Sequence, residues 1–269
     1  MRKSSFRLPV YRWHHGANLH WLVLCDHASN RIPAELGDLG LSAAQLRDHI
    51  AWDVGARDVA RRLAACLQAP MIEQGVSRLV IDANRAAGHR ELIPPISDGV
   101  SVPGNQSLSQ VERERRWDAY HQPYHRRIDR HLRQLKAISL APTLVSIHSF
   151  TPCLGSVAKP RPWPIGVLWD KDPVFGKHLI HEFARDIDLV GDNQPYDGRA
   201  LVGDTMDCHA ASRGLRHTTI ELRQDQLGTP AMRARWAKRL FRALMATAAQ
   251  MRGHAADLPA DDAVQPDSR

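Results

Sequence analysis

The hydrophobic pattern of the chain alternates between two periods. Short apolar or β-branched runs predict strands, and longer segments with apolar residues three and four apart predict helices. The predicted strands lie at 19–25, 70–73, 79–82, 143–148, 165–169 and 218–222, and the predicted helices at 51–67, 109–138, 173–186 and 230–251. This alternation is typical of an α/β fold, and we expect a three-layer sandwich with helices on both faces of a mixed, mainly parallel sheet.

Polar stretches add detail to this pattern. The residues from Ser109 onward resemble a capping box at the start of the long helix, and Pro123 is expected to kink or break that helix. Residues 86–106 are rich in Gly, Pro and Ser, and we expect this irregular segment to line a site. Residues 255–269 are polar and are predicted to be a disordered tail, which leaves 1–254 as a single domain.

Composition restricts the class of protein. The chain has 269 residues, near the upper size for one hydrophobic core, and 43% of them are hydrophobic. No apolar stretch reaches the roughly 18 residues that span a membrane. The N-terminus is basic but lacks the apolar segment of a secretory signal. We therefore expect a cytoplasmic protein without a membrane partner.

Charge and cysteines exclude further classes. The four cysteines are scattered and show no CxxC spacing, so neither a disulfide framework nor a thiolate zinc site is predicted. The formal charge of +7 is compatible with nucleic-acid binding. The arginines, however, are spread along helices that also carry acids. We interpret the charge as a solvated surface that attracts a small anionic substrate, with no nucleic-acid partner.

Two histidines occupy matched positions at the ends of predicted strands. His27 follows the first strand, and His148 ends the strand at 143–148. The carboxyl ends of parallel strands are where open sheets place ligand sites, and neutral imidazoles are good zinc ligands. Either histidine alone is better explained as a structural residue, but the matched pair favours a metal site.

A catalytic zinc site usually has three protein ligands. Asp53 is the predicted third ligand, at the start of the helix at 51–67, where the helix dipole favours a carboxylate. The same position is also compatible with a plain N-cap. Asp26 and Asn30, in the loop around the first histidine, are the alternatives.

Glu221, at the end of the strand at 218–222, is the predicted general base. It would take a proton from water and pass it to the leaving amine. A carboxylate at a buried strand end needs a reason, because burying an unpaired charge is costly. The alternative explanation is an ion pair with Arg223, Arg85 or Arg78.

Asn84 and Arg85 follow the predicted strand at 79–82. Arginine binds carboxylates through two parallel hydrogen bonds, so Arg85 is predicted to hold a substrate carboxylate together with Asn84. A structural ion pair with Asp82 or Asp98 explains the same spacing.

Other polar residues are assigned from their spacing. His121 and His125 are four apart and can share a helix face, although Pro123 lies between them. We expect His125 to line the site or act as a substitute ligand, and His121 to lie on the surface. His209 is predicted to polarise a carbonyl or stabilise an oxyanion, and Arg223 to bind substrate.

Taken together, six runs resemble the N-formylglutamate amidohydrolase family, in the expected order from about residue 16 to 250. They lie at 25–33, 50–56, 77–85, 147–152, 191–196 and 220–225. The resemblance implies a zinc-dependent hydrolase with the fold of zinc carboxypeptidases and cell-wall amidases. It also implies that His27 and His148 hold the metal, that Glu221 is the base, and that Asn84 and Arg85 clamp a substrate carboxylate.

The chain departs from related patterns at two places. Cell-wall amidases of this fold take their acidic ligand from the helix after the first histidine, which favours Asp53, whereas carboxypeptidases take it three residues after that histidine, where this chain has Asn30. The deformylases of the family typically carry Pro-His-Ser-Gly around the first histidine, and this chain has Asp-His-Ala-Ser at 26–29.

The expected function is hydrolysis of the amide bond of a small N-acyl amino acid with the help of zinc or another divalent ion. The first expected substrate is N-formyl-L-glutamate, which would yield formate and L-glutamate. The alternatives are a peptidoglycan amidase or carboxypeptidase, and a non-catalytic protein that binds an anionic ligand or nucleic acid. The sequence leaves the acyl group, the native metal and the oligomeric state open.

Overall fold

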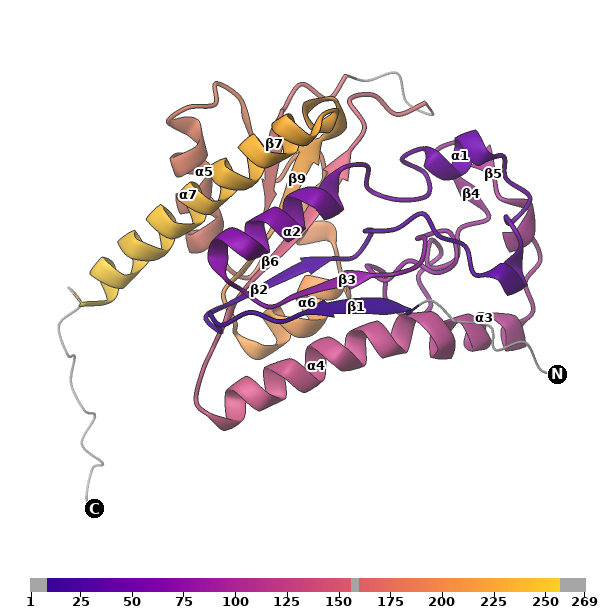
Figure 1. The fold of residues 1–269 in the computed structure, drawn as a ribbon, viewed down its shortest axis with the longest axis horizontal. Helices are drawn as coiled ribbons and strands as arrows, with labels where there is room; N and C mark the ends of the chain where they lie inside the picture. Colours follow the sequence, from indigo (N-terminus) through magenta and orange to yellow (C-terminus); the bar gives the residue numbers. More distant parts are fainter. Residues whose placement is uncertain (1–8, 156–159, 257–269) are drawn as a thin grey trace, which may run out of the picture.

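A mixed sheet of seven strands forms the centre of the structure, in the order β1-β3-β2-β6-β9-β7-β8 (Figure 1). The computed structural model describes residues 9–155 and 160–256. The strands are β1 Tyr11–His14, β2 Trp21–Cys25, β3 Met71–Gln74, β6 Thr143–Phe150, β7 Ile165–Leu168, β8 Val190–Asp192 and β9 His217–Arg223. The four central strands β3, β2, β6 and β9 run parallel, while β1 and β7 pair antiparallel with β3 and β9.

Helices cover both faces of this sheet, which confirms the predicted α/β sandwich. One face is covered by α2 (Ala56–Leu67), α5 (Pro173–Ala184) and α7 (Pro230–Ala256). The other face is covered by α4 (Gln122–Ala137) and α6 (Thr205–His209). Two short helices, α1 (Ala43–Arg47) and α3 (Gln110–Arg116), lie beyond these layers. A separate hairpin is formed by two strands of two residues each, β4 (Ile96–Ser97) and β5 (Val100–Ser101). None of the helices in the described ranges combines the length and apolar character that crossing a bilayer requires.

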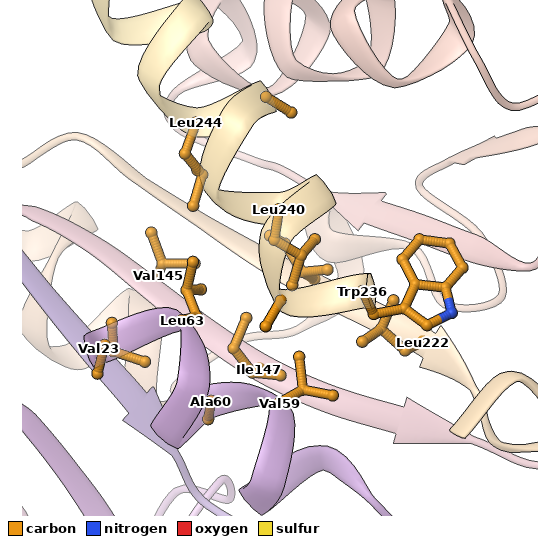
Figure 2. Packing of buried hydrophobic residues seen from close by; sticks show 14 of the residues in the cluster. Val23, Val59, Ala60, Leu63, Val145, Ile147, Leu222, Trp236, Leu240 and Leu244 are labelled. Carbon is orange, nitrogen blue, oxygen red and sulfur yellow. The ribbon is translucent and has the colours of Figure 1, made fainter. Parts of the chain in front are cut away.

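The alternation of side chains along the central strands divides the core into two layers. Val145 and Ile147 of β6 pack under α2 and α7, whereas Leu144 faces the α4 layer. Figure 2 shows the first layer, where Leu63 of α2 and Leu240 of α7 meet the buried side chains of the sheet. Because successive residues point to opposite faces, positions 146 and 148 of β6 share the α4 face with Leu144.

The pairing of β6 with β9 positions two of the predicted site residues. His148 lies directly opposite Glu221 in the parallel register. Both side chains therefore stand next to each other, close to the carboxyl end of the sheet. His27 lies two residues after β2, which is the other neighbour of β6.

The predicted strand at 79–82 is wrong. These residues are buried, but their backbone forms turns, with the Val80 amide donating to Ser77 O at 3.0 Å and the Asp82 amide donating to Leu92 O at 2.7 Å. A short apolar run identifies burial, and it does not distinguish a strand from a buried turn.

The predicted start of the first long helix is also wrong. α2 begins at Ala56, and its N-cap is Gly55 with a φ of +84°. A Cβ at Gly55 would lie 2.7 Å from Leu227 Cβ, so close packing as well as the backbone angle requires glycine there. Asp53 therefore lies in the preceding loop and is neither a helix residue nor the N-cap.

The long helix predicted at 109–138 continues through Pro123 with an irregular turn. α3 is capped by Ser109, whose Oγ accepts from the Glu112 amide at 3.2 Å. This is one half of the predicted capping box, because the Glu112 carboxylate pairs with Arg115 and Arg116. A π-helical segment at Trp117–His121 then leads into α4, in whose first turn Pro123 lies. The Gln122 amide bonds to Trp117 O in this π-helical turn, so the hydrogen-bond pattern changes just before the proline and the helix continues with a bulge. The predicted tail at 255–269 lies almost wholly outside the described residues.

Leu63→Ala should lower the free energy of unfolding by about 2–5 kcal/mol, because Leu63 is fully buried between the sheet and α7. Urea denaturation measures this change. Leu189→Ala is the matched control, since Leu189 is 44% exposed and should change stability by less than about 1 kcal/mol. Equal effects of the two substitutions would contradict the described core.

Candidate metal centre and active site

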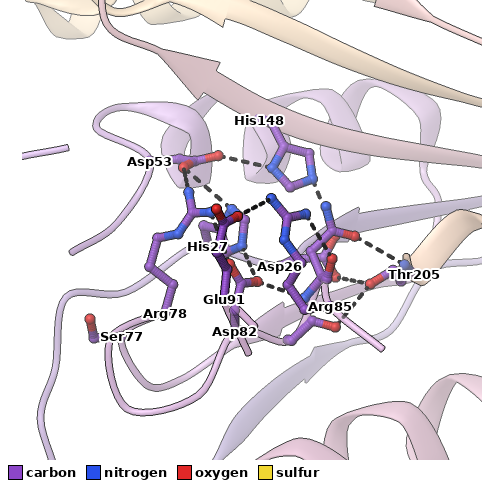
Figure 3. A network of polar contacts seen from close by, with 12 residues as sticks. Asp26, His27, Asp53, Ser77, Arg78, Asp82, Arg85, Glu91, His148 and Thr205 are labelled. Atoms are coloured by element: carbon purple, nitrogen blue, oxygen red, sulfur yellow. Dashed lines mark hydrogen bonds and ion pairs between the residues drawn. The ribbon is translucent and has the colours of Figure 1, made fainter. Parts of the chain in front are cut away.

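Three buried side chains form a group that could hold a metal ion. His27, Asp53 and His148 each offer one ligand atom, and these atoms lie within 4.8 Å of one another. They come from the loop after β2, the loop before α2 and strand β6, and Figure 3 shows them converging. The structure therefore brings together the three residues that the sequence proposed as ligands.

Asp53 lies between the two imidazoles. Its Oδ1 is 3.4 Å from His27 Nδ1, and its Oδ2 is 2.9 Å from His148 Nδ1. The backbone holds this carboxylate in place, because the Asp53 amide donates to His27 O at 3.0 Å and the Ser149 amide donates to Asp53 Oδ2 at 3.1 Å. His27 Nδ1 is buried, and the described part of the chain offers it no hydrogen-bond partner.

Two further carboxylates lie behind the histidines. Asp82 Oδ1 is 2.7 Å from His27 Nε2, and Asp26 Oδ2 is 3.2 Å from His148 Nε2. If each Nε2–H donates to its carboxylate, each Nδ1 presents a lone pair toward Asp53. This carboxylate–histidine arrangement is the usual second layer of a metal site, so the residues present fit a divalent cation.

Each outer carboxylate has its own supports. Asp82 accepts from Arg78 Nη2 and from the Asn84 amide, both at 2.8 Å. The partners of Asp26 are hydroxyl groups: Tyr124 at 2.8 Å, Thr205 at 3.0 Å and Ser146 at 3.1 Å. These bonds fix the outer carboxylates, which in turn orient the imidazoles.

The alternative third ligands are placed differently. Asp26 lies on the far side of the His148 ring from Asp53, as its contact with Nε2 shows. Asn30 donates its side-chain amide to Leu46 O at 2.8 Å. The geometry thus favours Asp53 as the acidic ligand, although for a reason other than the helix dipole.

The charges of the cluster favour bound positive charge. Burial opposes ionisation of Asp26, but hydrogen bonding and attraction from His148 outweigh it and lower the pKa of Asp26 to about 2. The pKa of Asp53 is lowered by the same competition, with burial opposed by attraction to His27 and a hydrogen bond from His148. Burial lowers the pKa of His148, but Asp26 and Asp53 raise it well above its usual range. Buried carboxylates that stay ionised require positive charge beside them, either on protonated histidines or on a bound metal cation.

Glu221 lies next to this cluster and is 6% exposed. Its burial, together with repulsion from Asp53, raises its pKa to about 7. Its Oε2 has no hydrogen-bond partner among the described residues. The alternative ion pair with Arg223, Arg85 or Arg78 is not found there, because these arginines pair with Asp225, Glu91 and Asp82. A carboxyl that titrates near neutral pH is suited to general acid and base catalysis.

A cavity of about 330 Å³ opens onto the three proposed ligands and Glu221. Its wall includes Asn84 and Arg85, as the sequence suggested, and residues of the segment at 86–106, such as Ile96 and Asp98 of the hairpin. The segment at 86–106 therefore contributes to the wall of this cavity.

The surroundings of Arg85 are compatible with anion binding. Arg85 Nη1 donates to Asn84 O at 3.1 Å, and Nη2 is 3.6 Å from Glu91 Oε2. Its buried Nε has no partner in the described ranges. No ion pair between Arg85 and either Asp82 or Asp98 is found among the described residues. Asp82 pairs with Arg78 and His27. Asp98 pairs with His49.

Three other predicted site residues do not line this cavity. The Arg223 guanidinium is 2.8 Å from Asp225 and donates to Pro162 O at 2.6 Å. His125 and His209 contact each other, with Nδ1 and Nε2 2.8 Å apart. The wall of the cavity in the described part of the chain includes none of the three. Their direct roles in binding or catalysis are therefore not supported by their positions.

Sequence reasoning missed several members of the site. Arg78 and Arg161, with Tyr196, line the cavity, and Asp82 supports His27. The sequence suggested Asp82 only as an ion-pair partner of Arg85. Its contact with His27 could not be predicted from spacing, because the two residues are 55 positions apart. Polar Ser146 between apolar neighbours on β6 was an available signal for a polar cluster on that face. His121, expected on the surface, is 4% exposed.

Comparisons with known proteins identify one family and two similar structures. The sequence model for N-formylglutamate amidohydrolase matches residues 19–227. The structure is similar to the gene product Atu2144 of Agrobacterium tumefaciens, with 32% identity and a TM-score of 0.86 over 90% of this chain and 96% of that chain. It shares its fold with N-formylglutamate amidohydrolase from Ralstonia eutropha, with 17% identity and a TM-score of 0.68 over 91% of this chain and 100% of that chain. A comparison with curated proteins gave no match.

The structure is a three-layer α/β sandwich with a carboxylate–histidine cluster at the carboxyl edge of its sheet. The chain belongs to the N-formylglutamate amidohydrolase family. Membership places it among hydrolases that cleave amide bonds, which the resemblance of the six sequence runs had implied.

Asp82→Asn should weaken Zn²⁺ binding about 10- to 100-fold, because the amide cannot orient and polarise His27 as the carboxylate does. Competition with a chromophoric chelator measures the dissociation constant. Asp225→Asn is the matched control, since Asp225 pairs with Arg223 outside the cavity. Unchanged affinity in Asp82→Asn would show that this carboxylate does not support a metal ligand.

Proposed function

We propose that this protein is a zinc-dependent amidohydrolase that cleaves the amide bond of a small N-acyl amino acid. One observation carries the proposal: β6 and β9 set His148 directly opposite Glu221, so a possible base stands beside the His27–Asp53–His148 group in one cavity. Family membership supports the reaction class, and the ligand set supports the metal.

His27, Asp53 and His148 would hold the zinc ion. Two neutral imidazoles and one carboxylate are a ligand set found in catalytic zinc sites, which leave a position open. When bound there, zinc would polarise the amide carbonyl and lower the pKa of water. Asp82 and Asp26 would keep the two rings oriented through their Nε2 atoms.

Glu221 would move the proton. With a pKa near 7 before a cation is bound, its carboxylate can take a proton from the attacking water, and its carboxyl can then donate that proton to the leaving nitrogen. A nearby cation favours the ionised form, so a bound metal would shift Glu221 toward the base form at neutral pH.

Asn84 and Arg85 would bind the carboxylate of the substrate. Arg85 has a buried Nε without a described partner, and its nearest carboxylate is the 48% exposed side chain of Glu91 at 3.6 Å. Arg78 and Arg161 add positive charge to the same wall. A cavity of about 330 Å³ suits a small ligand. N-formyl-L-glutamate is the first substrate we propose.

Glu221→Gln should reduce kcat about 10²- to 10⁴-fold and leave the zinc content unchanged, because glutamine keeps the shape of the side chain but cannot accept a proton. Hydrolysis of N-formyl, N-acetyl and N-succinyl amino acids by the wild-type protein identifies the substrate for this measurement. Turnover at the wild-type rate in Glu221→Gln would exclude Glu221 as the base.

Arg85→Met should raise KM for N-formyl-L-glutamate about 10- to 100-fold, because it removes the charged hydrogen bonds to the substrate carboxylate. Two analogues replace either the α-carboxylate or the γ-carboxylate of this substrate by an amide. The increase in KM caused by Arg85→Met should be small for the analogue that lacks the carboxylate bound by Arg85. Steady-state kinetics with the acid and both amides measures the difference. An equal loss for all three would contradict a carboxylate-binding role.

A further inference from the structure

Behind the cavity wall lies a column of four stacked rings that the proposed mechanism does not use. Trp117 stacks on His121 with ring centres 3.8 Å apart, His121 on His125 at 4.2 Å, and His125 on His209 at 5.1 Å. The interplanar angles are 15°, 23° and 15°. Three of these rings come from one helical stretch, and the fourth comes from α6.

Two rings of this column bind the backbone on either side of Asn84. His125 Nε2 is 2.8 Å from Ala83 O, and His121 Nε2 is 3.1 Å from Arg85 O. A carbonyl oxygen only accepts, so both Nε2 atoms carry hydrogen and donate. The two bonds hold the carbonyl groups that flank Asn84 against the helix.

These bonds determine which ring nitrogen carries hydrogen in each of the three histidines. Since His125 carries its hydrogen on Nε2, its Nδ1 is a lone pair that accepts from His209 Nε2 at 2.8 Å. His209 Nδ1 and His121 Nδ1 then remain as buried lone pairs, and neither has a hydrogen-bond partner in the described ranges. Burial, with His125 as the next cause, lowers the pKa of both His121 and His209 to about 3, and burial lowers the pKa of His125. The rings are neutral at physiological pH.

α6 completes the support of the same turn. The Thr205 amide donates to Asn84 Oδ1 at 3.0 Å, and Thr205 Oγ1 donates to Asp26 Oδ1 at 3.0 Å. α6 therefore connects the His125–His209 contact, the side chain of Asn84 and the carboxylate behind His148. Among the described residues the column is not part of a group of three metal-binding side chains.

We infer that His125, supported by His209 and His121, is a positioning residue that holds the Ala83–Arg85 turn so that Asn84 and Arg85 face the substrate. The inference rests on the proposed carboxylate clamp for its effect on binding. Its structural part, the fixed turn, stands on the hydrogen bonds alone.

The test compares two substitutions of His125 with a control on the same helix. His125→Leu removes the imidazole donor to Ala83 O and leaves the longer contact from Thr205 Oγ1 at 3.3 Å. His125→Gln keeps an amide N–H that can reach the same carbonyl. His131→Leu is the control, because His131 is 7% exposed on α4 but packs against Trp13. Zinc content and thermal unfolding of all variants report whether the fold and the metal site are intact.

The first readout is NMR of ¹⁵N-labelled protein. We expect His125 to carry hydrogen on Nε2, with a scalar coupling from His209 Nε2–H to His125 Nδ1. The amide signals of Asn84 and Arg85 should shift or broaden in His125→Leu and return in His125→Gln. Hydrogen on His125 Nδ1, or unchanged Asn84 and Arg85 signals in His125→Leu, would overturn the inference.

The second readout is binding of N-formyl-L-glutamate in the Glu221→Gln background, where turnover is blocked. His125→Leu should raise the dissociation constant about tenfold, His125→Gln should stay within about threefold of the parent, and His131→Leu should not change it. Equal binding by His125→Leu and its parent would overturn the positioning role. If the parent itself does not bind, the proposed substrate fails, and the NMR readout decides on the fixed turn.

Discussion

Negative charge that is buried at the carboxyl edge of the sheet is the constraint on which the site depends. Asp26, Asp53, Asp82 and Glu221 are each 6% exposed or less. Carboxylates out of water are costly unless cations or hydrogen-bond donors compensate them. Two histidines, Arg78 and a set of hydroxyl groups supply part of this compensation, and a divalent cation would supply the rest. This requirement explains why the polar residues lie in layers around the proposed ligands.

The pairing of strands in the sheet positions the buried polar residues relative to one another. Parallel pairing of β6 with β9 fixes His148 opposite Glu221, and alternation along β6 directs Ser146 and His148 toward the same face. The apolar layers under α2, α7 and α4 hold these strands in register. Behind the cavity, the column of stacked rings holds the turn at Ala83–Arg85 in place through hydrogen bonds to its backbone. Rigid elements thus support both the proposed metal ligands and the proposed substrate clamp.

Sequence patterns were sufficient for the parts of the molecule that depend on local order. Strand ends located His27, His148 and Glu221, because apolar runs and the residues that follow them are visible without coordinates. The turn at 79–82 was mistaken for a strand, since its side chains are as buried as those of a strand. Asp53 was selected for a position on a helix that it does not occupy. The roles of Asp82, His125 and His209 depend on contacts across 55 or 84 positions, which no spacing along the chain reveals.

Anomalous diffraction at the zinc absorption edge tests the central claim most directly. The account predicts, for crystals of zinc-loaded protein, one strong peak within bonding distance of His27 Nδ1, His148 Nδ1 and a carboxylate oxygen of Asp53, at about 2.0–2.2 Å from each. A peak held by other residues, or no peak at this position at full zinc loading, would contradict it.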